Sequence, residues 1–532
     1  MKTLLLALAL FAAGGWQDAV LHLVGADSVE ELDESELERF ESLLKHPLDL
    51  NGASRSRLLS SGLLSGYQVA SIEDYRYRHG DILSFTELAA VDGIGPATSE
   101  ALRYFIRLEP VRRKLRPDVS GTARTVVRKD EGADTEKSYG AKLKAAYGWM
   151  EASASYRDGF AGNLSFYGKR HLGKVVVGDY SARYGQGLLM WNGFSLSGLS
   201  SVSSFARNAS GVSPSNSWSP SARMRGVAAD INFGAFSASA SAALDGTATA
   251  GFSWLSRRWH AGASAAFADG KAGLSADWRV GLRNISLYGE AALDMVSMAP
   301  ALVAGVIWAP SYGTKYAFML RAYPSQYAGV MPGAVRSSTK VRDEVALSAG
   351  CQKKWLTLTM DALTHPSSGA FQLKALSVVT VPFEMWGVDF KPSVRVSERW
   401  RPQDARPLKT DLRFDLDASS GPWMAHYRFN VLAFRDLAWV WYLETGYKDK
   451  FSVYLRGGIF KVDNWDDRIY VYERDAPGSF NVPVCYGRGW NASLVAVWRK
   501  ITVRLSSVSY PWTLPTNSSK PTRLEFRAQL GF

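Results

Sequence analysis

From about residue 121 to its end, the chain alternates in polarity with a period of two residues. Between Leu412 and Leu416 apolar residues alternate with charged ones, and between Trp423 and Val431 every second residue is aromatic or apolar. Successive side chains of a β-strand point to opposite faces, so the pattern predicts strands with one apolar and one polar face. Repeated segments of about ten residues separated by turns are typical of a transmembrane barrel. A soluble β-sandwich alternates in the same way, so the pattern alone leaves both open.

The two ends of the chain favour the membrane barrel. After Met1-Lys2-Thr3, an apolar run and several small residues predict a secretory signal peptide over residues 1–15. The last segment, Thr522–Phe532, is apolar at alternate positions and resembles the assembly signal of outer-membrane barrel proteins. Residues 121–532 are therefore predicted to form a large antiparallel transmembrane β-barrel of about 22 strands, within a range of about 18–24, in the bacterial outer membrane. The predicted partners are outer-membrane lipid and, through the strand ending at Phe532, the barrel-assembly machinery.

Residues 27–108 follow a helical period instead, and we expect a small all-α periplasmic domain there. Asn51 and Ser84 are predicted N-caps of two of its helices. Residues 109–120, which hold two prolines and a run of basic residues, are predicted to be a linker. Residues 27–116 contain 12 Lys and Arg against 16 Asp and Glu, a net charge of −4. In residues 1–26 the charges of Lys2 and Asp18 cancel. Because the whole chain carries +12, the remainder carries about +16.

Within this domain, Val91–Leu102 places Gly93-Ile94-Gly95 between two short predicted helices, which resembles a helix-hairpin-helix motif. The glycines permit a tight turn that presents backbone N–H groups to a phosphate, and such contacts bind DNA without reading its sequence. Leu64-Ser65-Gly66 is a degenerate upstream copy. The predicted DNA-binding residues are the turn and the basic residues that follow it: Gly93, Ile94, Gly95, Thr98, Arg103, Arg107, Arg112, Arg113 and Lys114.

Residues 47–95, with Pro47–Asn51, Tyr75–Gly80 and Gly93–Gly95, resemble the competence-type periplasmic DNA receptors. The chain is similar also to exported helix-hairpin-helix proteins of Gram-negative bacteria that carry a large C-terminal barrel. The barrel segments that support this second resemblance are Val177–Tyr180, Tyr184–Leu188, Trp191–Gly193, Arg468–Glu473, Asp475–Phe480, Tyr486–Gly489 and the Phe532 terminus. The resemblance implies the architecture of a helical domain followed by a barrel.

Two functions remain open from the sequence. In the first, the helical domain binds the DNA backbone and the barrel takes part in DNA passage or uptake, which a basic barrel suits. The acidic balance of residues 27–116 opposes this reading, because nonspecific DNA binding is largely electrostatic. In the alternative, the barrel serves transport, secretion or envelope assembly without DNA, and the helical domain is a plug or a module that docks other envelope proteins. The basic excess would then face anionic lipid headgroups at the rims.

Several further expectations concern individual residues. The seven histidines show no metal-ligand or catalytic-triad spacing, so no catalytic residue, metal or cofactor is expected, and no enzyme. His426 shares a face with Arg428 and is expected in the lumen. Cys351 and Cys485 are expected to be unpaired on barrel strands. The serine-rich residues 195–221 predict an extended loop, either outside the barrel or in its lumen. Glycines such as Gly185 and Gly187 are expected at bends or close backbone approaches.

Overall fold

The computed structural model describes residues 15–32, 34–110, 117–168, 171–195, 198–256, 258–311, 313–477, 481–512 and 521–531. The predicted signal peptide (apart from Gly15), the basic residues Arg112, Arg113 and Lys114, and the terminal Phe532 lie outside these residues.

Most of the described chain is one closed antiparallel barrel of 24 strands, at the upper end of the predicted range. It closes where the first strand pairs with the last, with Val127 opposite Phe526. The strands are β3 (Asp118–Asp130), β4 (Thr135–Tyr147), β5 (Met150–Tyr156), β6 (Phe160–Tyr167), β7 (Leu172–Arg183), β9 (Met224–Phe233), β10 (Phe236–Ala243), β11 (Ala248–Leu255), β12 (Trp259–Ala268), β13 (Lys271–Leu282), β14 (Ile285–Asp294), β15 (Ala299–Ser311), β16 (Thr314–Tyr323), β17 (Glu344–Lys353), β18 (Leu356–His365), β19 (Ala370–Thr380), β21 (Val388–Trp400), β22 (Leu408–Ser420), β23 (Trp423–Ala433), β24 (Leu437–Lys448), β25 (Phe451–Val462), β28 (Gly487–Trp498), β29 (Ile501–Ser509) and β30 (Arg523–Gly531).

Along most barrel strands, charged side chains face the lumen and the large exposed apolar side chains face outward. On β23, Arg428 and Asn430 are 7% and 5% exposed, whereas Phe429 between them is 40% exposed. His426 also faces the lumen, as predicted, and bonds to Asp417 and to the hydroxyl of Tyr442. An exterior that is apolar on strand after strand requires an apolar solvent around it, which distinguishes this barrel from a soluble β-sandwich.

The two ends of the barrel differ. The end at which β3 begins and β30 ends has tight connections such as 283–284 and 499–500, and we call it the turn end. At the opposite end, the loop end, four connections are long: 184–223, 324–343, 463–486 and 510–522. Short strand pieces belong to these connections: β8 (Gly211–Pro214) pairs with the end of β7, and β26 (Ile469–Tyr470) pairs with β27 (Val484–Cys485). A further piece at the turn end, β20 (Phe383–Met385), pairs with β21.

The helical region is a unit with its own core. It comprises α2 (Trp16–Val24), the 3-10 turn η1 (Val29–Glu31), α3 (Glu34–Lys45), β1 (Leu48–Asp49), α4 (Arg55–Ser60), α5 (Gly66–His79), α6 (Phe85–Ala89), α7 (Gly95–Leu102) and β2 (Ile106–Arg107). Buried residues from Val20 to Phe105 pack into one cluster, so α2 joins the predicted domain although it precedes residue 27. We call residues 16–107 the helical domain. No helix of the described residues is long and apolar enough to cross a membrane.

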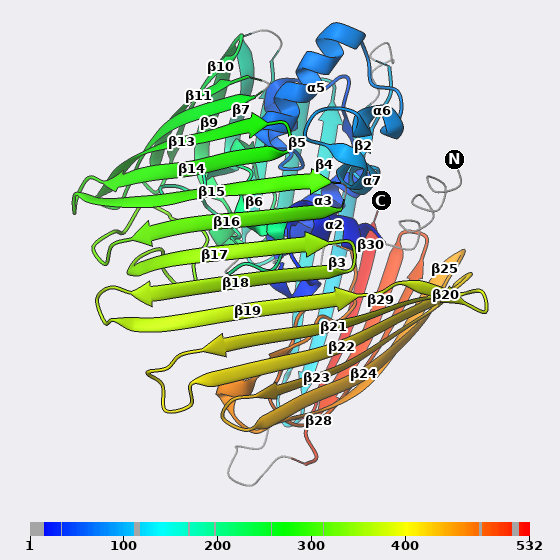
Figure 1. The fold of residues 1–532 in the computed structure, drawn as a ribbon. Helices are drawn as coiled ribbons and strands as arrows, with labels where there is room; N and C mark the ends of the chain where they lie inside the picture. The colour runs from blue at the N-terminus through cyan, green and yellow to red at the C-terminus, as the bar shows by residue number, and fades with distance from the viewer. Residues whose placement is uncertain are drawn as a thin grey trace.

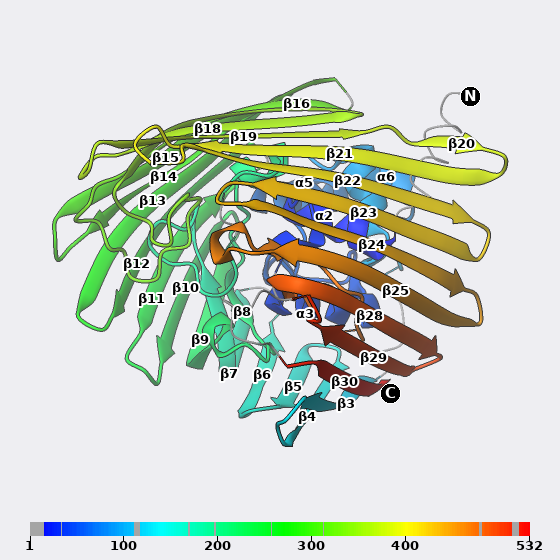
Figure 2. The same ribbon diagram turned by 90° about the horizontal axis from the view of Figure 1, so that it is seen from below.

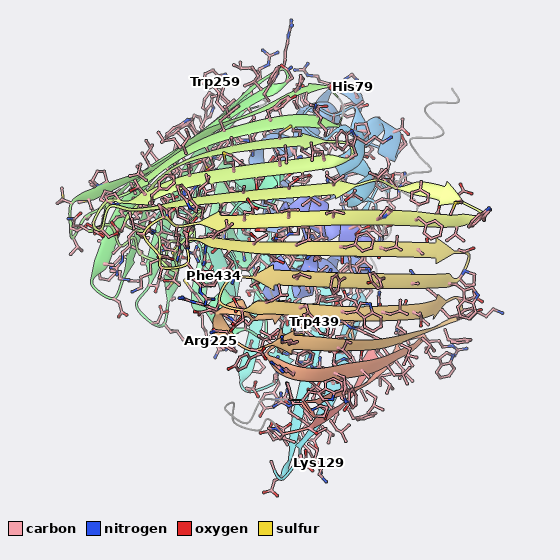
Figure 3. All side chains as sticks on the ribbon, turned by 60° about the horizontal axis from the view of Figure 1, so that its bottom comes forward. His79, Lys129, Arg225, Trp259, Phe434 and Trp439 are labelled. Atoms are coloured by element: carbon pink, nitrogen blue, oxygen red, sulfur yellow. The ribbon has the colours of Figure 1, made fainter. Side chains whose placement is uncertain are left out.

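The helical domain lies largely within the barrel. Figures 1 and 2 show α2 and α3 enclosed by the strands. Only its outer part, where α5 ends at the exposed His79, reaches the rim (Figure 3). The predicted linker is correspondingly shorter than expected, because β3 already begins at Asp118.

Two of the residue-level expectations for the helical domain are tested. The side chain of Ser84 accepts from the backbone N–H of Glu87 at 3.1 Å, so its predicted role as an N-cap is confirmed. The prediction for Asn51 is wrong, because Ser54 precedes α4. The buried Asn51 amide instead bonds to both backbone groups of Ile82, at 2.9 Å each, and so fastens two loops together. This use depends on long-range packing, which a local capping pattern does not contain.

Candidate functional site

Buried carboxylates of the helical domain meet basic side chains of the lumen wall at the interface between the two. Its centre is Glu30 of η1, whose side chain is 10% exposed. Its carboxylate accepts from the guanidinium of Arg428 on β23 and from the backbone N–H of Tyr472 at 3.0 Å, and lies 3.8 Å from Arg413 on β22. Burial raises the pKa of Glu30, but the two arginines outweigh it and hold the pKa well below its usual value. Glu30 is therefore a carboxylate while the domain is docked.

Helix α3 extends the same pattern along a second part of the wall. Glu36 lies 3.1 Å from Arg183 of β7, and Glu38 lies 2.6 Å from Lys142 of β4. Burial opposes ionisation of Glu36, but Arg39 and Arg183 lower its pKa below the usual value. For Glu38, burial dominates and raises the pKa despite Lys142.

Further pairs lie around the edge of the domain. Asp27 pairs with Arg395 of β21 at 3.0 Å, and Glu34 pairs with Arg157 at 3.1 Å. At the turn end, Asp18 lies 3.3 Å from Lys391. The acidic edge of the helical domain (Asp18, Asp27, Glu30, Glu34, Glu36 and Glu38) thus faces a basic wall drawn from β4, β7, β21, β22 and β23.

This pairing accounts for the charge asymmetry of the chain. The basic residues that we predicted to meet DNA or lipid headgroups include arginines that pair with carboxylates of the protein's own first domain. Two features of the sequence pointed to this pairing. One was the opposite net charge of the two regions, −4 for residues 27–116 and about +16 for residues 117–532. The other was the position of Arg395, Arg413 and Arg428 on the polar faces of their strands. The pairs join residues up to 398 positions apart, so a local pattern does not reveal them.

Two of the long loops, 184–223 and 463–486, contact the helical domain from the loop end. Loop 184–223, which includes the predicted serine-rich loop, turns inward rather than outside the barrel. The backbone N–H groups of Gln186 and Leu188 donate to the buried carboxylate of Glu290 on β14, at 2.6 and 3.0 Å. A side chain at Gly185, whose φ is +55°, would collide with that carboxylate. The close approach expected for these glycines is therefore observed.

Trp218 joins this loop to the helical domain. Its backbone N–H donates to Glu38 at 3.2 Å, and its ring is flanked by Arg124 and Lys142 at 4.1 and 4.2 Å from the ring centroid. Loop 463–486 makes the corresponding contact through Tyr472, whose hydroxyl accepts from Gln17 at 3.1 Å. Cys485 lies in this loop on β27, not on a barrel strand as predicted, whereas Cys351 lies on β17, and the two are not joined by a disulfide.

The predicted hairpin turn faces the barrel wall. Gly93 and Gly95 have φ values of +81° and +70°, as a tight turn between α6 and α7 requires. The ring of Tyr67 fills the space beside Gly93, and its other edge lies against Gly281 of β13. The degenerate upstream turn also faces the wall, since Gly66 lies against Leu255 and His260.

The predicted DNA-binding residues are only partly brought together. Gly93, Ile94, Gly95 and Thr98 line one cavity of about 470 Å³ between the helical domain and the wall. Arg103 pairs with Glu100 at 3.0 Å and lies over the ring of Phe85. Arg107 lies in the β1–β2 ladder, away from that cavity, and its carbonyl accepts from Leu50. Among the described residues, the turn and the basic residues therefore do not form one continuous surface.

No family model matches the chain, and no curated protein matches it. Solved structures similar to it are outer-membrane proteins. The translocation pore of the P pilus usher PapC is 10% identical, with 78% of this chain and 99% of that chain covered and a TM-score of 0.40. The outer membrane protein OpdK of Pseudomonas aeruginosa is 8% identical, with 78% and 98% covered and a TM-score of 0.32. OccAB3 of Acinetobacter baumannii is 7% identical, with 78% and 99% covered and a TM-score of 0.32.

Proposed function

We propose that the protein is an outer-membrane transport barrel that is closed by its own N-terminal helical domain. The observation that carries this proposal is the acidic edge of the helical domain, which is matched residue by residue to basic residues of the lumen wall. In this proposal the domain is a resident plug, and passage through the barrel requires it to move. A binding module for an external partner would not need its charged edge to complement the wall.

The orientation of the barrel supports a plug that enters from the periplasm. Outer-membrane barrels have short periplasmic turns and longer extracellular loops. The turn end, where β3 begins and β30 ends, then faces the periplasm, and the helical domain would enter the lumen from that side. The inward loops 184–223 and 463–486 would meet it from the cell surface.

The chemistry of the interface suits a plug that docks in one position and can still leave. Burying an ion pair contributes little net stability, because the desolvation of both charges offsets their attraction. If the domain docks in another position, however, its buried charges lose their partners. Each broken buried pair then costs about 3–5 kcal/mol, so misplaced docking is unfavourable. The interface therefore selects one docked position without making it irreversible.

The test is ionic conductance of the full-length protein in planar lipid bilayers. We expect the wild type to be closed for most of the recording time. The triple variant Glu30→Gln, Glu36→Gln, Glu38→Gln should open frequently, since each change removes a charge that faces the wall. The matched control changes three carboxylates whose ion pairs lie within the helical domain: Glu73→Gln, Asp74→Asn and Glu100→Gln. Equal conductance of both triple variants would reject the plug.

DNA binding by the helical domain remains a prediction from its helix pairs. In the docked position the Gly93–Gly95 turn faces Tyr67 and the wall, so contact with a duplex would require the domain to leave the lumen. Duplex DNA titrated onto the triple variant, across a salt series, tests this prediction. Binding that weakens with salt and is lost with Gly93→Glu and Gly95→Glu would support DNA passage. Absence of binding at low salt would exclude a DNA-receptor role for this domain.

A further inference from the structure

A second cavity, of about 640 Å³, lies on the lumen side of β21, β22 and β23 toward the loop end. Glu30 and Glu31 of the helical domain line its inner part, and Asp466 and Arg468 of loop 463–486 line its outer part. It is separate from the cavity at the Gly93 turn.

The inner part of this cavity is neutralised by the helical domain. Arg395 pairs with Asp27 and Asp411, and Arg413 pairs with Asp415 and lies near Glu30. Each of these arginines therefore has carboxylate partners within the protein, and the inner part has no surplus positive charge to offer an anion.

The outer part is not neutralised. Arg401 donates to the side-chain oxygen of Gln372, and Lys409 donates to the backbone carbonyl of Asp466 at 2.7 Å. Arg468 donates to the Trp465 carbonyl and the Tyr470 hydroxyl, at 3.0 Å each.

The side chain of Arg399 makes no hydrogen bond or ion pair with the part of the chain that the structure describes; its guanidinium carbon lies 5.3 Å from the centroid of the Phe434 ring. Two carboxylates line this part of the cavity, and one of them, Asp466, is already paired with Arg435. Four cations (Arg399, Arg401, Lys409 and Arg468) thus face a single remaining carboxylate, Asp404.

The arrangement of these cations is fixed by an aromatic ring and remains accessible. Arg399, Lys409 and Arg435 surround Phe434, at 5.3, 5.4 and 4.8 Å from its centroid. Cations over an aromatic face are held in place without losing their charge. Figure 3 shows Phe434 at the loop end of β23. The side chains of Arg435 and Asp466 are 41% and 51% exposed, so solvent reaches this edge of the cavity.

We propose that this outer part of the cavity binds a small soluble anion that carries two or more oxyanionic groups, such as phosphates or carboxylates. Guanidinium groups bind such oxygens through paired N–H donors, and Lys409 adds a point charge. The site is reached from the loop end and does not require the helical domain to move. Its occupancy can therefore be measured on the closed, full-length protein, and its failure would leave the proposed plug untouched.

The experiment is isothermal titration of inorganic tripolyphosphate into the full-length protein in detergent, at constant ionic strength adjusted with sodium chloride. We expect saturable binding with one equivalent per chain. The variant Arg399→Gln, Lys409→Gln should bind about tenfold or more weakly, since it removes two charged donors. The control variant Arg342→Gln, Lys353→Gln removes two cations that do not line this cavity and should bind as the wild type does.

Two results would overturn the proposal. One is the absence of saturable binding to a wild type that is shown to be folded by its heat-dependent migration in gels. The other is an equal loss of affinity in both double variants, which would show that binding depends only on the net charge of the barrel. If the variant at Arg399 and Lys409 does not fold, Arg399→Lys alone is the substitute. It keeps the charge but loses the paired donors, and should weaken binding by about threefold or more.

Discussion

Replacing Glu30 by Gln should loosen the helical domain more than any other single neutral substitution in its acidic edge. The amide can still accept from the backbone N–H of Tyr472, but it leaves Arg413 and Arg428 to share one carboxylate, that of Asp415. Removing one partner of a buried ion pair costs about 3–5 kcal/mol. We expect about 2–3 kcal/mol here, because the retained hydrogen bond and water entering the lumen recover part of that cost. At about 1.4 kcal/mol per factor of ten, the undocked fraction should rise about 30- to 140-fold.

Single-channel recording measures this fraction as open probability. Asp74→Asn is the matched control, because Asp74 pairs with Arg78 on the surface of α5 at 3.0 Å. The effect has a defined pH window. Since docking lowers the pKa of Glu30 from its ordinary value of 4.5, its contribution is complete above pH 4.5 and declines as the pH falls below that value. An open probability within about twofold of the control at pH 7 would refute the reasoning, because it would correspond to less than about 0.5 kcal/mol.

Three further predictions concern other parts of the structure. Burial and the nearby Lys315 lower the pKa of His22 from 6.5 to about 4, so docking should weaken as the pH falls from 6.5 toward 4, and His22→Gln should reduce this dependence of open probability. Trp218→Leu removes the contacts by which the ring holds loop 184–223 to Arg124 and Lys142 of the wall, at about 0.5–1 kcal/mol each. The backbone N–H that donates to Glu38 is then held less firmly, and open probability should rise by at most about tenfold. Arg321→Met leaves two buried carboxylates unpaired within the wall. It should destabilise the barrel by about 3–5 kcal/mol and lower the temperature of its gel-mobility shift, while Arg321→Lys recovers part of the loss.

The architecture of the barrel was predictable because it repeats a local pattern. Each strand carries its own alternation, so the lumen positions of His426 and Arg428 follow from the residues next to them. The strand number was predicted only as a range, because the sequence does not mark every turn between strands. The short strands β8 and β20 are an example, because each pairs with a barrel strand but belongs to a connection between strands.

The docking of the helical domain was only half predictable. A plug was one of the two readings of the sequence, and the opposite charges of the two regions were visible in it. The partner of each charge was not, because Glu30 and Arg428 are 398 positions apart in the sequence. The inward course of loop 184–223 was equally hidden, since its anchor Glu290 lies more than 100 residues away in the sequence. Such contacts follow from topology and not from local propensity.

The most direct test of the central claim, that the acidic domain sits inside the lumen, is zero-length carbodiimide coupling in isolated outer membranes. The reagent joins a carboxylate to a lysine only where the two are in contact. Asp18 and Lys391 lie 3.3 Å apart and are about half exposed, so mass spectrometry should find their peptides linked, and Lys391→Arg should abolish the link. Lys144 and Glu151 within the barrel, 3.9 Å apart, provide the positive control. A link between Lys144 and Glu151 without any link from Asp18 to Lys391 would place the helical domain outside the barrel and contradict the account.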